Sequence, residues 1–436
     1  MSFQISRSLT VVLLLAACPG GNATTSATET GGASTTETTT DEATTPGSTT
    51  AEPTTTTSAE PTGTTSTGAT TTSSTGESTT GLDCSESRLI ARWEMPEPTK
   101  CFGIAMDDSQ AITVLAGESN SDSYRAELHR FVDGEPAWSV VHPPQYSFVR
   151  PFALAVRGDG VAVIAGFAAD PTPGSFEFLP WTAAYDATGA LLWEHIDSTN
   201  MCDSPPCRQG RNQGVVVTAD GEFLVAGERG LYKDFAFDMT GVLRRYDAAM
   251  GEIDIAEFPM PYNFDDDMTK GLALRADGGV VMVGQSSPTP IQNDLWVARL
   301  AADGALEAID TLDLGKQEEV EHVAALSDGS IVITGITDIG GDFFAARLDA
   351  ALTMLWSEEV GWYGQVVAGA DDAVFAATEE YRIVEKFTAD GNPQWADDPC
   401  LEGDGSAAIG LSPDGAQLLV CRTDDEVTVV EIYDAT

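Results

Sequence analysis

The chain has 436 residues, of which 68 are acidic and 22 are basic, so its formal net charge at pH 7 is −46. A surface of this sign repels phosphate groups, which argues against nucleic-acid partners and against simple docking on anionic lipid headgroups. The composition is uneven, because residues 19–83 are almost entirely Thr, Ser, Gly, Ala, Pro and Glu and contain no aromatic side chain. The remainder, about 350 residues, is long enough for one large folded domain.

Residues 1–18 have the features of a secretory signal. One base, Arg7, precedes an apolar run from Leu9 to Leu15, and small residues follow. The run is too short to span a membrane. Its end, Leu15 to Cys18, resembles the bacterial lipobox. That resemblance implies that Cys18 becomes a diacylated N-terminus, which would anchor the exported chain to the outer membrane or cell surface of a Gram-negative-type bacterium. The alternative is an ordinary signal peptide with an incidental cysteine.

The Thr-rich tract of residues 19–83 is predicted to be disordered, because it cannot bury enough apolar surface to offset its ordering entropy. As a flexible coil it would span roughly 45 Å and hold the rest of the chain clear of the membrane. The predicted organisation is therefore a signal peptide with a lipobox at 1–18, a linker at 19–83 and a folded domain at 84–436.

A repeated unit occupies most of that domain. Its clearest copy runs from Val323 to Trp356 and is predicted to form four short strands, with an Asp328-Gly329 turn between the first two. Seven copies begin at residues 103, 153, 215, 272, 324, 366 and 409. One such unit buries too little apolar surface to be stable alone, so the copies are expected to pack side by side.

The ends of the repeat array predict a closed ring. The last copy has only three strands, whereas Ser87–Pro96 precedes the first copy and places Trp93 where other copies have a fourth-strand tryptophan. An N-terminal strand that completes the last unit leaves no open edge. We therefore predict an all-β, seven-bladed β-propeller of four-stranded antiparallel blades. An open solenoid is the alternative, but it would need capping repeats.

The repeats resemble those of known propeller families. The segment Asp277–Leu306 is similar to the delta-60 repeat, and Ala184–Trp193 resembles the tryptophan-docking motif of quinoprotein-like propellers. The second resemblance implies that the fourth-strand tryptophan packs between neighbouring blades. The residues concerned are Trp138, Trp193, Trp356 and Trp395.

Six cysteines remain besides Cys18, an even number that suits disulfides in an exported protein. Cys202 and Cys207 are close neighbours in one loop and are predicted to pair. Cys400 with Cys421 is the favoured second pair, which leaves Cys84 with Cys101. Swapped pairings among these last four remain open.

No catalytic constellation is evident. The four histidines are scattered, and His195 and His322 are interpreted as structural residues in or beside strands. Nucleophile elbows, H-E-x-x-H motifs and phosphate-binding Gly-rich loops are missing from the sequence. The acidic or polar loops Asn263–Asp267 and Ser119–Ser123 lack the D-x-D-x-D-G spacing of a calcium loop. We predict no enzyme activity, no cofactor and no metal.

The loops expected on one rim of the ring are rich in aromatic residues and form the candidate binding surface. Its predicted residues are Tyr146, Phe148, Arg150, Trp181, Tyr262, Phe264, Trp362 and Tyr363. The leading hypothesis is a monomeric, lipid-anchored surface propeller that binds or scaffolds a protein or glycan. Alternatives are a periplasm-facing envelope assembly scaffold and a degenerate quinoprotein-like enzyme.

Overall fold

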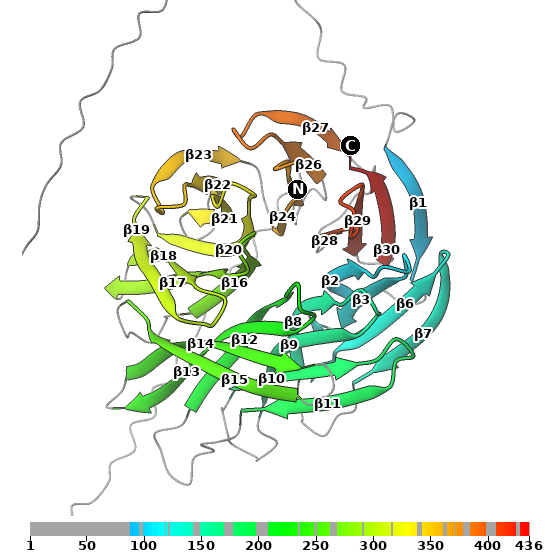
Figure 1. The fold of residues 1–436 in the computed structure, drawn as a ribbon, viewed down its shortest axis with the longest axis horizontal. Helices are drawn as coiled ribbons and strands as arrows, with labels where there is room; N and C mark the ends of the chain where they lie inside the picture. The colour runs from blue at the N-terminus through cyan, green and yellow to red at the C-terminus, as the bar shows by residue number, and fades with distance from the viewer. Residues whose placement is uncertain are drawn as a thin grey trace, which may run out of the picture. The chain divides into compact units, whose positions relative to one another are not determined.

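A computed structural model gives the fold of the domain (Figure 1). Within the residues it describes, no helix has the length and apolar character needed to cross a membrane. The predicted signal peptide and linker lie outside those residues. The described residues are 88–95, 99–117, 119–120, 123–142, 149–169, 178–197, 208–233, 236–247, 251–261, 268–289, 292–314, 317–337, 342–360, 364–369, 371–377, 384–397, 407–423 and 428–435.

Seven four-stranded antiparallel sheets form the blades, and the four strands of each blade are named from the innermost to the outermost. Blade 1 is β2 (Lys100–Met106), β3 (Ile112–Gly117), β6 (Glu127–Val132) and β7 (Glu135–Val141), with a small extra pair, β4 (Ser119–Asn120) and β5 (Ser123–Tyr124). Blade 2 is β8 (Val149–Val156), β9 (Ala162–Ala169), β10 (Phe178–Tyr185) and β11 (Leu191–Ile196). Blade 3 is β12 (Arg208–Val217), β13 (Phe223–Lys233), β14 (Ala236–Asp247) and β15 (Gly251–Pro259).

The remaining blades repeat this order. Blade 4 is β16 (Met268–Leu274), β17 (Val280–Thr289), β18 (Gln292–Leu300) and β19 (Leu306–Leu312). Blade 5 is β20 (Glu318–Ala325), β21 (Ile331–Thr337), β22 (Asp342–Leu348) and β23 (Met354–Val360). Blade 6 is β24 (Val366–Ala368), β25 (Val374–Ala377), β26 (Val384–Phe387) and β27 (Pro393–Asp397). Blade 7 is β28 (Ala407–Leu411), β29 (Gln417–Thr423), β30 (Thr428–Asp434) and β1 (Leu89–Glu94).

The predicted ring closure is confirmed. Strand β1 pairs antiparallel with β30, and Trp93 lies opposite Val430. The N-terminal strand therefore completes blade 7, whose other three strands are the last three of the chain. Figure 1 shows β1 on the outer side of β30, as the outermost strand of the last blade. The chain is therefore a seven-bladed β-propeller, and the open-solenoid alternative is wrong.

The apolar core lies in the seams between blades. The described buried residues form seven clusters, and each cluster draws on two neighbouring blades. One of them joins Val114 of blade 1 to Leu419 and Val430 of blade 7. Because that last seam is as apolar as the other six, burial of apolar surface stabilises the closed ring rather than an open stack.

Turn chemistry explains the Asp and Gly signals of the repeat. In blade 2 the Asp186 carboxylate accepts hydrogen bonds from the backbone N–H groups of Thr188 (2.8 Å) and Ala190 (2.9 Å). Gly189 follows with φ of +83°, a left-handed conformation that glycine adopts without steric cost. The predicted Asp328-Gly329 turn is built similarly, with φ of +82° at Gly329.

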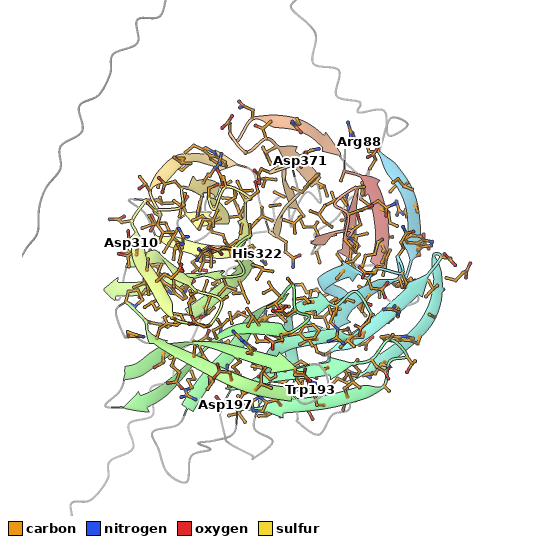
Figure 2. All side chains as sticks on the ribbon, viewed as in Figure 1. Arg88, Trp193, Asp197, Asp310, His322 and Asp371 are labelled. Atoms are coloured by element: carbon orange, nitrogen blue, oxygen red, sulfur yellow. A yellow bond between two sulfur atoms is a disulfide. The ribbon has the colours of Figure 1, made fainter. Side chains whose placement is uncertain are left out.

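The fourth-strand tryptophans dock on the following blade, as the resemblance implied. Trp138 of blade 1 donates from Nε1 to the Ala187 carbonyl of blade 2 at 2.9 Å, and Trp356 of blade 5 donates to the Ala389 carbonyl of blade 6 at 3.2 Å. Trp193 of blade 2 stacks on Tyr246 of blade 3, with ring centroids 5.0 Å apart. Figure 2 shows Trp193 on the outer side of the ring. The side chain of Trp395 is outside the described part.

This docking gives a first prediction. Trp356→Ala should lower the free energy of unfolding by about 2 kcal/mol, because it removes a half-buried ring from a seam and one of the hydrogen bonds that the Ala389 carbonyl accepts, while the bond from Arg347 remains. The adjacent Leu355 is 53% exposed, so Leu355→Ala should change stability by less than about 0.5 kcal/mol. Urea unfolding of the two variants checks this. Equal losses would show that the docked ring contributes nothing specific.

One disulfide lies within the described residues, and it corrects the favoured pairing. Cys101 of blade 1 is bonded to Cys421 of blade 7, with Cα atoms 6.0 Å apart. The favoured pairs Cys400 with Cys421 and Cys84 with Cys101 are therefore wrong, and one of the swapped pairings left open is present. The sequence places Cys101 and Cys421 320 residues apart, whereas ring closure brings the first and last blades together. Cys84, Cys202, Cys207 and Cys400 lie outside the described residues.

Candidate functional site: the axial channel and its mouth

Five innermost strands share a local irregularity in their pairing with the second strand. In each, the pairing with the second strand shifts by one residue, so that one residue is passed over. A bulge of this kind changes the direction of a side chain and is common beside binding sites. The residues passed over are Phe102, Phe152, Gln213, Lys270 and Glu321.

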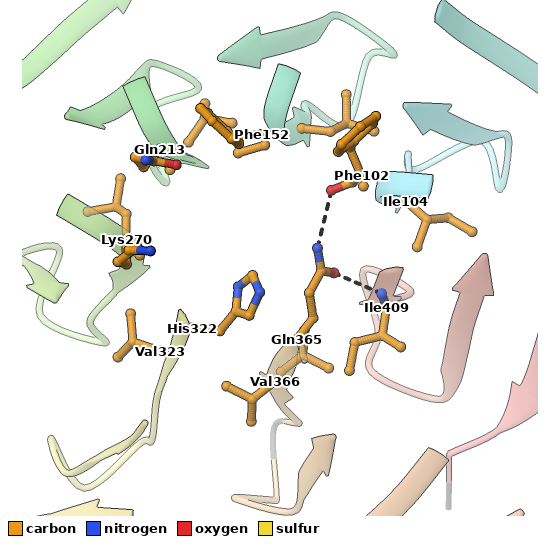
Figure 3. A pocket seen from close by; sticks show the side chains of 18 residues that line it. Phe102, Ile104, Phe152, Gln213, Lys270, His322, Val323, Gln365, Val366 and Ile409 are labelled. Atoms are coloured by element: carbon orange, nitrogen blue, oxygen red, sulfur yellow. Dashed lines mark hydrogen bonds between the residues drawn. The ribbon is translucent and has the colours of Figure 1, made fainter. Parts of the chain in front are cut away.

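All five of these residues line one cavity of about 420 Å³, which we call the axial mouth. It continues into an axial channel of about 180 Å³ between the innermost strands. The residues that line the channel but not the mouth are mainly small and apolar, such as Gly214, Val323 and Val366. Figure 3 shows Phe102, Phe152, Gln213, Lys270, His322 and Gln365 around the open centre. The mouth lies within the range of about 300–1,000 Å³ that is typical of ligand pockets.

Gln365 fixes one side of the mouth. Its Nε2 donates to the Phe102 carbonyl of blade 1 at 3.2 Å, and its Oε1 accepts from the Ile409 N–H of blade 7 at 2.9 Å. The side chain thus bridges from blade 6 to the two blades that close the ring, as the dashed lines in Figure 3 show. Because both ends of the amide are engaged, this wall is held rigidly before any ligand arrives.

The charge of the mouth is opposite to that of the whole chain. Four bases line it, Lys100, Arg150, Arg211 and Lys270, against one acid, Glu321. In the full sequence acids outnumber bases by 68 to 22. A cluster of four bases in one cavity is therefore a local reversal of sign, and in a partly enclosed site it concentrates a positive field.

Within the described residues, three of these bases differ from others in having no carboxylate at ion-pair distance. Arg244 pairs with Asp197 at 2.6 Å, and Arg422 pairs with Glu431 at 2.8 Å. By contrast, Lys100, Arg211 and Lys270 form no ion pair with any carboxylate in the part of the chain that the structure describes. With about three acids for every base, pairing would be easy to arrange, so this arrangement leaves positive charge available inside the mouth.

Aromatic rings rather than carboxylates position two of the guanidinium groups. The Arg150 guanidinium lies 5.1 Å from the centroid of the Phe152 ring. The Arg211 guanidinium lies 5.8 Å from the centroid of Phe167 and 5.9 Å from that of Phe178. Cation–π contacts hold a cation in place without neutralising its charge.

His322 extends from β20 toward the centre of the ring (Figure 2) and lines both the mouth and the channel. Burial, together with the nearby positive charge of Lys270, lowers the pKa of His322 to about 4. The imidazole is therefore neutral at pH 7 and offers one hydrogen-bond donor and one acceptor. A structural role was predicted for His322, and the structure places it in the lining of the mouth, whereas the other three histidines contact acidic or hydroxyl side chains.

A buried acid, Glu228, lies close to two bases of the mouth, Arg211 and Lys270. Glu228 of β13 accepts a hydrogen bond from the Thr269 N–H at 3.0 Å. Burial raises the pKa of Glu228 to about 7, although the charges of Arg211, Lys270 and Arg244 oppose the shift. A carboxyl group with this pKa changes its protonation near neutral pH.

The raised pKa predicts a pH dependence of stability. Folding disfavours the ionised form, so Glu228 does not lower the free energy of unfolding below its unfolded pKa of 4.5. The free energy of unfolding then falls progressively as the pH rises from 4.5 to about 7. Glu228→Gln should therefore be more stable than the wild type at pH 8, by on the order of 1–3 kcal/mol, and match it more closely at pH 4.5. Urea unfolding from pH 4.5 to 8 measures this. A constant difference between the two proteins would contradict the assignment.

The predicted rim residues are only partly in the described structure. Arg150 lines the mouth, directly at the start of β8. Trp181 is wrong as a rim residue. It is fully buried on β10 in the seam between blades 1 and 2, and its Nε1 donates to Glu194 at 2.8 Å. Tyr146, Phe148, Tyr262, Phe264, Trp362 and Tyr363 lie outside the described residues.

One cluster of acidic groups lies apart from the mouth. Asp294, Asp313 and Glu318 have carboxylate oxygens within 4.8 Å of one another, although each has further polar contacts. The sequence spacing did not indicate this cluster. The loop Asn263–Asp267, weighed for calcium, lies outside the described residues, as do the side chains of Ser119–Ser123.

Sequence comparison identifies no relative, since no protein-family model and no curated protein matches the chain. The fold does have relatives among solved structures. Virginiamycin B lyase from Staphylococcus aureus superimposes with a TM-score of 0.50 and 11% identity, covering 79% of this chain and 99% of the lyase chain. Kuenenia stuttgartiensis hydrazine synthase gives a TM-score of 0.51 and 12% identity, covering 77% of this chain and 96% of the other. At such low identity these similarities establish the propeller fold alone.

Proposed function

We propose that this protein is an exported, lipid-anchored binding module that takes up a ligand at the axial mouth and does not transform it chemically. The anchor and the spacer rest on Cys18 and the Thr-rich tract of the sequence. The location of the site rests on the geometry of the innermost strands.

One observation carries the proposal: the bulge residues differ between blades. Positions that maintain the repeated fold largely keep their residue type, since most blades have a turn glycine at positive φ and Trp recurs in the fourth strands of every blade except blades 3 and 4. The five bulges instead present Phe, Phe, Gln, Lys and Glu to one cavity. Side chains that vary at a repeated position, and converge on a concave site, are typical of ligand recognition.

A thermal-shift screen of the full-length protein against organic acids, sugars and short peptides tests the proposal. At least one compound should raise the melting temperature, since a ligand that binds only the folded state stabilises it. Gln213→Trp, which fills the mouth, should abolish the shift, whereas Leu355→Trp on the exposed outer strand should preserve it.

The same samples separate the competing hypotheses. The bound compound should be recovered unchanged after prolonged incubation, whereas conversion to product would support the degenerate-enzyme alternative. A shift that persists in Gln213→Trp would place the ligand elsewhere and refute the proposed site. Protease treatment of whole cells distinguishes surface display, in which the propeller is cleaved, from the periplasm-facing scaffold, in which it survives.

A further inference from the structure

We infer that the ligand of the axial mouth is a compact organic oxyanion with at least two negative charges. This inference rests on the proposed function, because it specifies the chemistry of the same site. Four bases and one acid line the cavity, and Lys100, Arg211 and Lys270 have no carboxylate at ion-pair distance among the described residues, although the buried Glu228 lies near enough for Arg211 and Lys270 to affect its pKa. A single carboxylate would leave most of that positive charge unmatched, so a multiply charged anion fits best.

The surroundings of the bases favour an oxyanion over a simple halide. Arg211 presents a planar fork of N–H donors that suits carboxylate and phosphate oxygens. Lys270 adds ammonium donors from the adjacent blade. The Gln213 amide and the neutral His322 ring offer uncharged polar contacts beside them. Phe102 and Phe152 supply apolar walls for the carbon skeleton of an organic anion.

The rest of the protein limits the size of the ligand. Outside the mouth the chain carries a large excess of acids, so a long polyanion lying across the ring would be repelled along most of its length. Screening reduces this repulsion only beyond about 8–10 Å at physiological salt. A compact anion seated in the cavity of about 420 Å³ experiences the four bases and avoids the acidic exterior.

Carboxylates and phosphates share this chemistry, so calorimetry of the full-length protein should use both. Citrate and glucose 6-phosphate are the multiply charged probes, glucose is the neutral probe, and heparin is the long polyanion. At least one of the first two should bind about tenfold or more tighter than glucose, and the affinity should fall as salt is raised from about 50 to about 300 mM. Which of them binds distinguishes a carboxylate ligand from a phosphate ligand.

Variants then assign the binding to the mouth. Lys270→Met and Arg211→Met should each weaken binding by about tenfold or more, whereas Lys270→Arg should retain most of it. Arg157→Met is the matched control, because it removes the same charge from a base that pairs with Asp159 at 2.6 Å outside the mouth. It should change the dissociation constant by less than about twofold. Unchanged melting curves would confirm that the variants fold.

Several results would overturn the inference. Equal binding of glucose and the two anions would remove the charge preference, and equal losses in Arg157→Met and Lys270→Met would indicate a nonspecific effect of net charge. Heparin binding as tight as that of citrate or glucose 6-phosphate would refute the compact ligand. If neutral compounds bind and Gln213→Trp blocks them while the anions do not bind, the proposed function stands and only the anionic specificity fails.

Discussion

Deletion of residues 88–95 should abolish cooperative unfolding of the propeller. The deletion removes β1, and with it the antiparallel ladder to β30 and the Trp93 ring that packs against the seam of blades 7 and 1. Each hydrogen bond of this ladder contributes a net of about 1 kcal/mol to stability. Together with the half-buried tryptophan, the loss in the free energy of unfolding is about 5 kcal/mol or more. That loss is comparable to the whole stability of a typical domain, about 5–15 kcal/mol. Calorimetry should show a broad, weak transition.

Exposure of β30 adds a second effect. An uncovered strand presents unpaired N–H and C=O groups to other molecules, so the truncated protein should also aggregate in a concentration-dependent way. Deletion of residues 60–67, an equal length from the Thr-rich tract, is the matched control and should leave the transition unchanged. A truncated protein that melts as sharply as this control would show that β1 does not close the ring.

Loss of the Cys101–Cys421 disulfide should be the next most damaging change. The two cysteines are 320 residues apart in sequence, so the bond removes much conformational freedom from the unfolded chain. The chain-entropy relation gives about 6 kcal/mol for a loop of this size, and measured losses are typically about 2–5 kcal/mol. The double variant Cys101→Ala, Cys421→Ala should lower the free energy of unfolding by about 2–5 kcal/mol.

Both sulfur atoms are also buried, so packing must be separated from cross-linking. The reduced wild-type protein keeps the sulfur atoms and loses only the bond, and it should recover part of the difference between the double variant and the oxidised protein. If reduction leaves the unfolding free energy unchanged, the bond contributes no stability and the loss in the double variant comes from packing alone.

The ring architecture was predictable because its signals are local and repeated. The Asp-Gly turns, the alternating strands and the fourth-strand tryptophans recur in successive copies, and the unmatched Ser87–Pro96 segment indicated how the ends meet. The structure bears out each of these through the positive φ of Gly329, the docking of Trp356 and the pairing of β1 with β30.

The site was not predictable in the same way. A bulge results from the pairing of two strands, and sequence periodicity alone does not reveal which residue the pairing passes over. The aligned repeats begin at residues 103, 153 and 272, so Phe102, Phe152 and Lys270 lie just outside them. A usable signal existed, because each precedes a small residue, Gly103, Ala153 or Gly271, in the innermost strand.

Two errors concern residues that are buried in seams between blades. Trp181 looked like an exposed aromatic in a loop, but β10 extends to it and buries it in a seam. Cys421 was paired with Cys400 because both belong to the last copy, whereas Cys101 lies across the seam between the last and first blades. Such contacts depend on how distant copies meet rather than on local sequence.

A crystal structure of the full-length protein with selenate, an oxyanion located by its anomalous scattering, tests the anionic mouth most directly. We expect seven blades closed by β1 and an anomalous peak within hydrogen-bond distance of Lys270 or Arg211, competed away by whichever of citrate and glucose 6-phosphate binds in solution. An open ring would contradict the closed propeller. Selenate bound only outside the mouth under saturating conditions would contradict the proposal that the bases of the mouth bind an anion.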